Sequence, residues 1–172
     1  MKKIGSLLII CFSILFFVGC KKDSVNSSSS AYYMKATIGG TAKVFTFNPN
    51  VIKFDVGGTS SLAFNAAIGS TSLEGLALQI TRSPGTITAG TYTDGGNNDY
   101  VVGGTYNPGS NDLSAIYGAG MKISVTAPLK VVITQITASK VTGTFNGEFF
   151  DNSGSGSKSL LITNGEFNLP IQ

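Results

Sequence analysis

The feature of this chain that most limits its fold is a regular alternation of apolar and polar residues. In the stretch 62–68 every second residue is apolar, beginning with Leu62 and Phe64, and the stretch 76–81 repeats the pattern. A period of two is typical of β-strands with one buried face, whereas a helix needs apolar residues three or four apart. Threonine, serine, glycine and β-branched residues, which are weak helix formers, predominate. We therefore predict an all-β domain with little or no helix.

Glycine pairs mark where the predicted strands turn back. Both central positions of a type I′ hairpin turn require positive φ, so the pair Gly39-Gly40 predicts a tight hairpin. Closing the hairpin there sets Met34 opposite Phe45 and Tyr32 opposite Phe47. Both strands then share one apolar face, which makes this register self-consistent.

Beyond this hairpin the pattern varies in strength. The stretch 51–56 predicts a third short strand that carries Ile52, Phe54 and Val56 on one side. Between residues 84 and 120 the alternation fades, because turn-forming glycine, proline and asparagine interrupt it. We expect short strands with long loops there. Loops of that length in a compact domain are more often functional or disordered than neutral connectors.

The C-terminal part recovers a strong strand pattern. Strand-like stretches follow one another at 121–125, 129–137, 141–149 and 159–169. We expect the last two to pair antiparallel, with Thr163 opposite Phe145 and Phe167 opposite Val141, so that large side chains face slim ones.

A short motif of glycine, one further residue and an aromatic residue recurs at irregular spacing. It occurs at 90–92, 104–106, 143–145, 147–149 and 165–167. We expect the glycine where a strand bends or a neighbour crowds it, and the aromatic ring on the core face. The stretch 31–172 is thus predicted to be a single all-β domain, an antiparallel β-sandwich of about nine or ten strands. A closed or partly open β-barrel is the alternative.

The first twenty residues indicate export and lipidation. Lys2 and Lys3 precede an apolar run, 4–18, that is too short for an ordinary bilayer span, and Gly19 precedes Cys20. This is the pattern of a lipoprotein signal peptide, although Phe17 stands where leucine is usual. We predict a signal peptide at 1–19 and acylation of Cys20. An ordinary signal peptide or an uncleaved anchor is the alternative.

Residues 20–30 are predicted to be the lipidated cysteine and a flexible tether, because the stretch has one apolar residue to bury. The domain would then hang from the outer membrane, on its periplasmic side or at the cell surface. The signal contains Lys2 and Lys3 of the 12 basic residues, so 10 remain against 9 acidic ones. From Lys35 onward the lysines are spread singly along the chain, which disfavours nucleic acid as a partner.

The residue types present exclude several chemistries. The chain has no histidine, and Cys11 and Cys20 fall in the signal and at the lipid site. Ser-His-Asp and Cys-His catalysis and the usual zinc sites are therefore excluded. A carboxylate-dependent hydrolase would need two acids close together in space. The predicted strand register places Glu148 and Glu166 several residue pairs apart. We expect no catalytic residues, no metal and no cofactor.

The best candidate site is a group of aromatic and polar residues in the segment where the alternation fades. It comprises Tyr92, Asn97, Asp99, Tyr100, Tyr106 and Tyr117. Aromatic rings with amide and carboxylate groups suit a sugar or another small ligand. A noncatalytic binding module is therefore the first hypothesis, and it requires exposed tyrosines that converge. A structural or protein-partner role is the alternative, and it would show as an exposed apolar patch or a bare sheet edge.

Several stretches together resemble a known group of proteins. They are Cys20-Lys21-Lys22-Asp23, the segment 34–40, Pro84-Gly85 with Gly90-Thr91-Tyr92, and the segments 141–145 and 162–167. In these the chain is similar to small β-rich lipoproteins of Bacteroidota, a family with a domain of unknown function. The resemblance implies a lipid-anchored envelope protein with a β-fold, and it implies no activity.

Overall fold

The computed structural model describes residues 32–95, 99–120, 126–152 and 158–172. The predicted signal peptide, Cys20, the tether, the strand-like stretch 121–125 and Asn97 lie outside the described residues.

The described residues form eleven antiparallel strands and one turn of 3-10 helix. The elements are β1 (Tyr33–Ile38), β2 (Thr41–Phe45), β3 (Phe47–Val56), β4 (Thr59–Ala67), β5 (Glu74–Arg82), β6 (Gly90–Thr93), β7 (Tyr100–Pro108), η1 (Leu113–Ala115), β8 (Tyr117–Ala119), β9 (Lys130–Ile136), β10 (Lys140–Asp151) and β11 (Ser159–Pro170). The main path of the sheet runs β2-β1-β11-β10-β8-β7-β5-β4-β3, and β9 pairs with β6 and β10.

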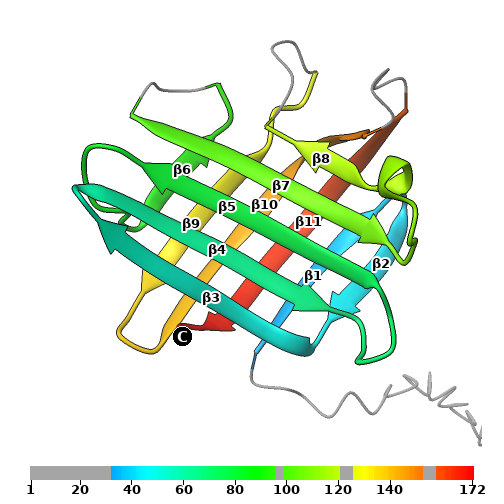
Figure 1. Ribbon diagram of the computed structural model, residues 1–172, viewed down its shortest axis with the longest axis horizontal. Coiled ribbons are helices and arrows are strands. Elements are labelled where there is room, and N and C mark those ends of the chain that lie inside the picture. The colour runs from blue at the N-terminus through cyan, green and yellow to red at the C-terminus, as the bar shows by residue number, and fades with distance from the viewer. Residues whose placement is uncertain (1–31, 96–98, 121–125, 153–157) are drawn as a thin grey trace, which may run out of the picture.

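This single sheet folds over on itself into two crossing layers (Figure 1). β3, β4, β5 and β7 form a front layer, and β1, β2, β9, β10 and β11 run behind it. The short strand β8 joins the layers by pairing with β7 on one side and β10 on the other. At the far edge the N–H of Gln172 donates to the carbonyl of Val51 at 2.9 Å. The sheet is therefore nearly closed into a barrel, which confirms the predicted all-β antiparallel fold with one strand more than the upper estimate.

One hydrophobic core fills the space between the layers. Along β4 and β5 the alternating residues that begin with Leu62 and Leu76 point inward and are buried, as the pattern predicts. They meet aromatic rings from the back layer, among them Phe167, whose centroid lies 5.0 Å from that of Phe64. The buried residues of both layers belong to one contiguous cluster.

The first hairpin confirms half of its predicted register. Met34 pairs with Phe45 across the turn. Tyr32 and Phe47 do not pair, because β2 ends at Phe45 and the chain crosses to the front layer, where Phe47 begins β3 opposite Ala67.

The predicted register of the last hairpin is wrong. Phe145 faces Gly165 instead of Thr163, and Phe167 faces Gly143 instead of Val141. Two shifts of one residue add up. The pairing beside the loop, Phe149 with Leu160, is already one residue off the predicted register, and an irregularity near Asn164, which adopts a positive φ of 51°, shifts the pairing of β10 and β11 by one residue more. The expected fit of large against small is retained with different partners.

Four of the five recurring glycines lie where neighbours crowd the backbone, whereas a Cβ on Gly90 would meet nothing within 4 Å. A Cβ on Gly143 would lie 2.5 Å from Cζ of Phe167, and one on Gly147 would lie 2.6 Å from Cα of Leu129. A Cβ on Gly104 would lie 2.8 Å from Cζ of Phe149. Glycine is therefore required at these positions for packing.

The segment 84–120 is more regular than its turn-forming residues suggest. The expectation of short strands only is wrong for β7, which pairs with β5 along nine residues. Gly103 and Gly104 lie inside this strand instead of in a turn, and the Phe149 ring occupies the space where a Cβ of Gly104 would lie.

Candidate functional site

The first pair of predicted site tyrosines packs against the core. Tyr92 is buried, with 4% of its surface exposed, and its ring meets that of Tyr100 edge-on at 5.2 Å between centroids. The Tyr92 hydroxyl donates to the Thr88 carbonyl at 2.8 Å. The Tyr100 oxygen accepts from the N–H of Thr93 at 3.2 Å. Both hydroxyls are therefore held by the backbone.

The second pair lies at the other end of β7. Tyr106 and Tyr117 face each other in the register of β7 and β8, with ring centroids 6.4 Å apart. They line a pocket of about 350 Å³ together with Asp151 and Lys158. Tyr106 itself is 4% exposed.

The requirement for converging, exposed tyrosines is therefore not met. Tyr100 and Tyr106 are six residues apart in one strand, so both point inward, but at opposite ends of it. Asp99 is exposed next to Tyr100, and its carbonyl accepts from the N–H of Ser83. The segment resembled a binding site because tyrosine serves equally well as a core residue with a bonded hydroxyl.

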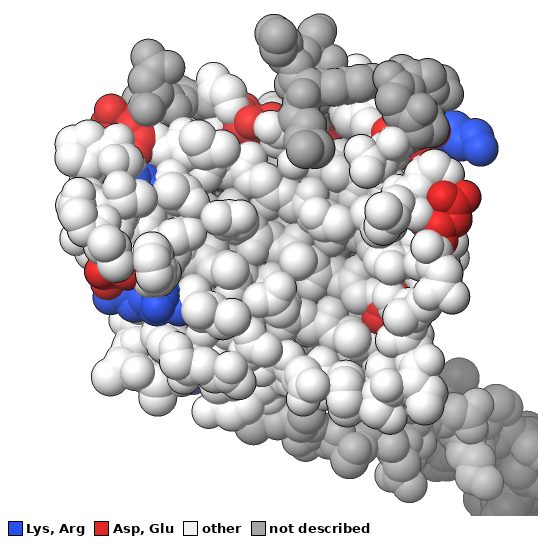
Figure 2. Space-filling model, viewed as in Figure 1, with Lys and Arg blue, Asp and Glu red and all other residues white. Residues whose placement is uncertain are grey.

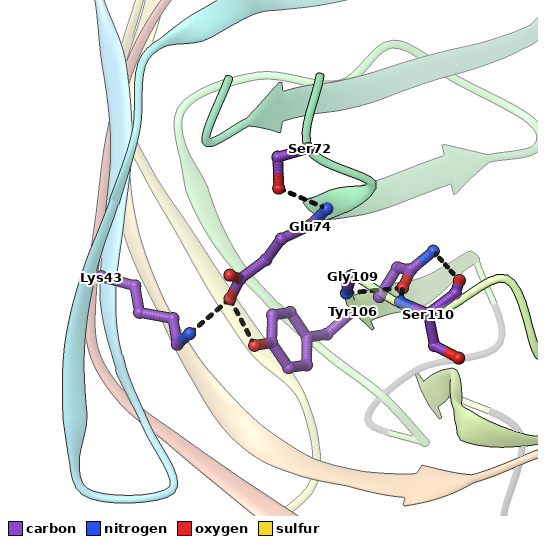
Figure 3. Close-up of polar contacts among 7 residues, drawn as sticks. Lys43, Ser72, Glu74, Tyr106, Gly109 and Ser110 are labelled. Atoms are coloured by element: carbon purple, nitrogen blue, oxygen red, sulfur yellow. Dashed lines mark hydrogen bonds and ion pairs between the residues drawn. The ribbon is translucent and has the colours of Figure 1, made fainter. Parts of the chain in front are cut away.

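A polar cluster ties the two layers together beside Tyr106 (Figure 3). Lys43, from β2 in the back layer, lies 2.5 Å from Glu74 Oε1 at the start of β5. The Tyr106 hydroxyl donates to the same oxygen at 2.6 Å. Burial, and then the bond to Glu74, raise the pKa of Tyr106 well above its usual range. All three groups satisfy one another, so this cluster is a structural tie and offers no unpaired base or nucleophile.

The acids do not assemble a catalytic pair. Glu166 contacts Lys35 at 2.8 Å and accepts from the Tyr33 hydroxyl, and these bonds lower its pKa. The residue opposite Glu166 in the hairpin is Thr144, and Glu148 lies four residues beyond it on the same strand. Glu148 is therefore about 13 Å from Glu166 along the strand direction. Within the described ranges no group of three histidine, cysteine, aspartate or glutamate residues could hold a metal ion.

The most distinctive surface is the outward side of the front layer, which we call the uncharged face. Its side chains stand in rows across β3, β4, β5 and β7. The rows are Phe47, Ala67, Gly75 and Asn107; Asn50, Asn65, Ala77 and Thr105; Ile52, Ala63, Gln79 and Gly103; and Phe54, Ser61, Thr81 and Val101. None of these residues carries a charge. Figure 2 shows this face, with Lys, Arg, Asp and Glu only toward its margins.

The middle of the uncharged face is hollowed, because its residues are small. Two adjoining hollows of about 370 and 270 Å³ share Asn65, Ala77 and Thr105 in their lining. Alanine and glycine form the floor, and Phe47, which is 37% exposed, stands at one end. We call the two hollows together the trough. Across the first three rows it extends about 14 Å along the strands.

The trough has hydrogen-bonding groups that the protein does not fully use. The Asn65 amide donates weakly to Asn50 Oδ1 at 3.5 Å, and the Gln79 amide donates to Thr81 Oγ1 at 3.2 Å. Asn65 Oδ1, Gln79 Oε1 and the Thr105 hydroxyl have no partner among the described residues. The trough therefore presents neutral acceptors and a hydroxyl above an apolar floor.

Reasoning from the sequence missed this face because it followed the apolar half of the alternation. The outward half, which includes Asn65, Ala77 and Gln79, was expected only to face water. The signal was available: exposed strand positions usually include charged residues, and the outward positions of these four strands include none.

Neither a protein-family model, nor a curated protein, nor a solved structure matches this chain. In the part of the chain that the structure describes, no helix has the length and apolarity to cross a membrane.

Proposed function

We propose that this protein is a noncatalytic binding module of the cell envelope that holds an uncharged glycan in the trough. The observation that carries the proposal is the absence of charge over a hollowed face that still offers amide and hydroxyl groups. A sugar ring has apolar faces and neutral hydroxyls. The alanine and glycine floor with Phe47 suits the former, and Asn65, Gln79 and Thr105 suit the latter.

The charge distribution favours a neutral ligand over an ionic one. Phosphate, uronate or nucleic acid would need lysine or arginine for compensation. The nearest charged residues of β3, Lys53 and Asp55, alternate with the outward side chains and pair with each other at 3.0 Å. They supply no net charge to the face.

The anchor is part of the same proposal. Lipidation of Cys20 would hold the protein on the outer membrane, with ten residues of tether before the domain. Such a chain spans about 17 Å on average and roughly 35 Å when extended. The uncharged face then stands clear of the headgroups, within reach of envelope polysaccharide.

The test is retention of the full chain on immobilised neutral oligohexoses (glucans, mannans and galactans) and on their uronate and phosphorylated counterparts. Ala77→Arg places a long charged side chain in the centre of the trough and should abolish retention on the neutral ligands. Ala42→Arg, at an exposed position of β2 in the back layer, is the matched control and should bind as the unsubstituted chain does. Equal loss in both variants would contradict a site in the trough.

A protein-partner role is the second candidate, favoured by one observation. Ile52, Phe54 and Val56 are 50%, 57% and 60% exposed on adjacent outward positions of β3. These three side chains along β3 form the exposed apolar patch that such a role requires.

A further inference from the structure

β3 is the last strand of the sheet path, and part of its outer edge is bare. Of the described strands only β4 pairs with it. On the other side the C-terminus bridges Val51 through Ile171 and Gln172. Beyond that bridge, at 53–55, no described segment pairs with the edge. A bare edge is a ready template for another strand.

The hairpin geometry shows which backbone groups face outward. Gly57 and Gly58 have φ of 61° and 80°, so Val56 and Thr59 flank a two-residue turn and bond to each other. Because the bonded pairs alternate along the strand, Val56, Phe54 and Ile52 point their N–H and C=O groups at β4. Lys53 and Asp55 point their N–H and C=O groups away from β4. Val51 has the same orientation, since its C=O accepts from the N–H of Gln172 on the outer side.

The edge is complementary to itself. We propose that a second copy of this chain pairs antiparallel with β3, with Phe54 opposite the partner's Phe54. In this register Lys53 lies opposite the partner's Asp55, and Asp55 lies opposite the partner's Lys53. Each of these pairs exchanges two backbone hydrogen bonds, which uses the N–H and C=O groups that face outward.

The charges select this register over its neighbours. A two-fold pairing centred on Lys53 would set lysine against lysine, and one centred on Asp55 would set aspartate against aspartate. Like charges directly opposite each other destabilise a strand pair, and opposite charges stabilise it. The register centred on Phe54 also sets Ile52 against the partner's Val56, so the exposed apolar side chains of β3 in the two copies meet.

The symmetry gives a closed dimer with a consequence for binding. The two front layers join into one continuous sheet, and both uncharged faces lie on the same side of it. A long glycan could then contact two troughs at once, which would raise its apparent affinity. That consequence rests on the proposed function, whereas the pairing itself does not.

The contact is small, so we expect a weak dimer that a cross-link detects best. In the full chain, Phe54→Cys places two cysteines at the two-fold axis, with Cα atoms about 4.5 Å apart, within reach of a disulfide. Val56→Cys is the control of similar exposure. In the proposed register its two copies are separated by about 14 Å along the strands, so it should not self-link. The unsubstituted chain, whose cysteines are Cys11 and Cys20, sets the background.

A charge exchange tests the same register independently. Lys53→Glu sets glutamate against the partner's Asp55 twice per dimer, and it should weaken dimerisation about tenfold in sedimentation of the full chain in detergent. The double variant Lys53→Glu/Asp55→Lys should restore it. Thermal melting checks that each variant folds.

Four results would overturn the proposal. The first three are equal cross-linking at positions 54 and 56, failure of the double variant to restore the dimer, and a chain that stays monomeric with no link at 54. The fourth is open-ended oligomers, because they would mean that β3 pairs with a different edge strand, such as β2 at the other end of the sheet path.

Discussion

Phe145 in β10 packs directly over Gly165 in β11, and its ring fills the space that a side chain at position 165 would need. A Cβ on Gly165 would lie 2.7 Å from Cδ1 and from Cδ2 of Phe145. The Phe145 ring is 2% exposed, and its centroid lies 6.4 Å from that of Phe167. Aromatic rings and glycines on facing strands thus interlock in the core.

Truncating this ring should be among the most costly single changes in the protein. Phe145→Ala should lower the free energy of unfolding by about 3 to 5 kcal/mol, because it leaves a cavity that the rigid strands cannot close. Urea unfolding measures the loss. A loss below about 1 kcal/mol would show that the ring does not fill the core.

The glycine half of this packing has its own test. Gly143→Ala should destabilise by about 1 to 3 kcal/mol or more, because the new methyl group would meet Phe167 and the Val132 carbonyl. Gly69 is the control, since a Cβ there meets nothing within 4 Å. Gly69→Ala should stay within about 0.5 kcal/mol of the unsubstituted protein in the same unfolding experiment. If the two variants lose equal stability, crowding is not the reason for glycine at position 143.

The tie between the layers should appear in the alkaline stability of the protein. The folded pKa of Tyr106 is raised, so the unfolded chain loses this proton near pH 10 while the folded chain retains it. The stabilising effect is therefore complete below about pH 10 and declines as the pH rises from there toward the folded pKa. Tyr106→Phe should remove this component of the alkaline slope, measured as unfolding free energy from pH 8 to 11. Parallel curves for the two proteins would contradict the assignment.

The proposal that Cys20 carries a lipid anchor predicts an all-or-none result. Cys20→Ala should abolish fatty-acid labelling and move the protein from the membrane to the soluble fraction, because the acyl chains supply about 0.8 kcal/mol per buried CH₂. A variant that stays membrane-bound and uncleaved would identify the apolar run 4–18 as the anchor instead.

The period-two pattern predicted the strands because a strand with one buried face needs an apolar residue at every second position. The alternation in β4 and β5 and the pairing of Met34 with Phe45 follow from it directly. The irregularity at Asn164 was not predictable, because no rule requires an asparagine in the left-handed conformation there. Gly104 was counted among the turn-forming residues of 84–120 because its reason is tertiary, namely the Phe149 ring from a distant strand.

The candidate site was harder to predict than the fold. A tyrosine that packs and one that binds a sugar have the same sequence pattern, and only the burial of Tyr92 and Tyr106 distinguishes them. The uncharged face depends on the order of four strands that are not all consecutive in the chain. Asn65, Ala77 and Thr105 become neighbours only when β4, β5 and β7 lie side by side.

The most direct test of the binding proposal is a two-dimensional NMR titration of the full chain in detergent with the neutral oligohexoses. The side-chain amides of Asn65 and Gln79 should shift progressively with saturation. The side-chain amide of Asn146, exposed on β10 in the back layer, should stay in place. Uronate and phosphorylated ligands should leave all three unchanged. Shifts at Asn146 without shifts at Asn65 and Gln79, or no shift with any neutral ligand, would contradict glycan binding in the trough.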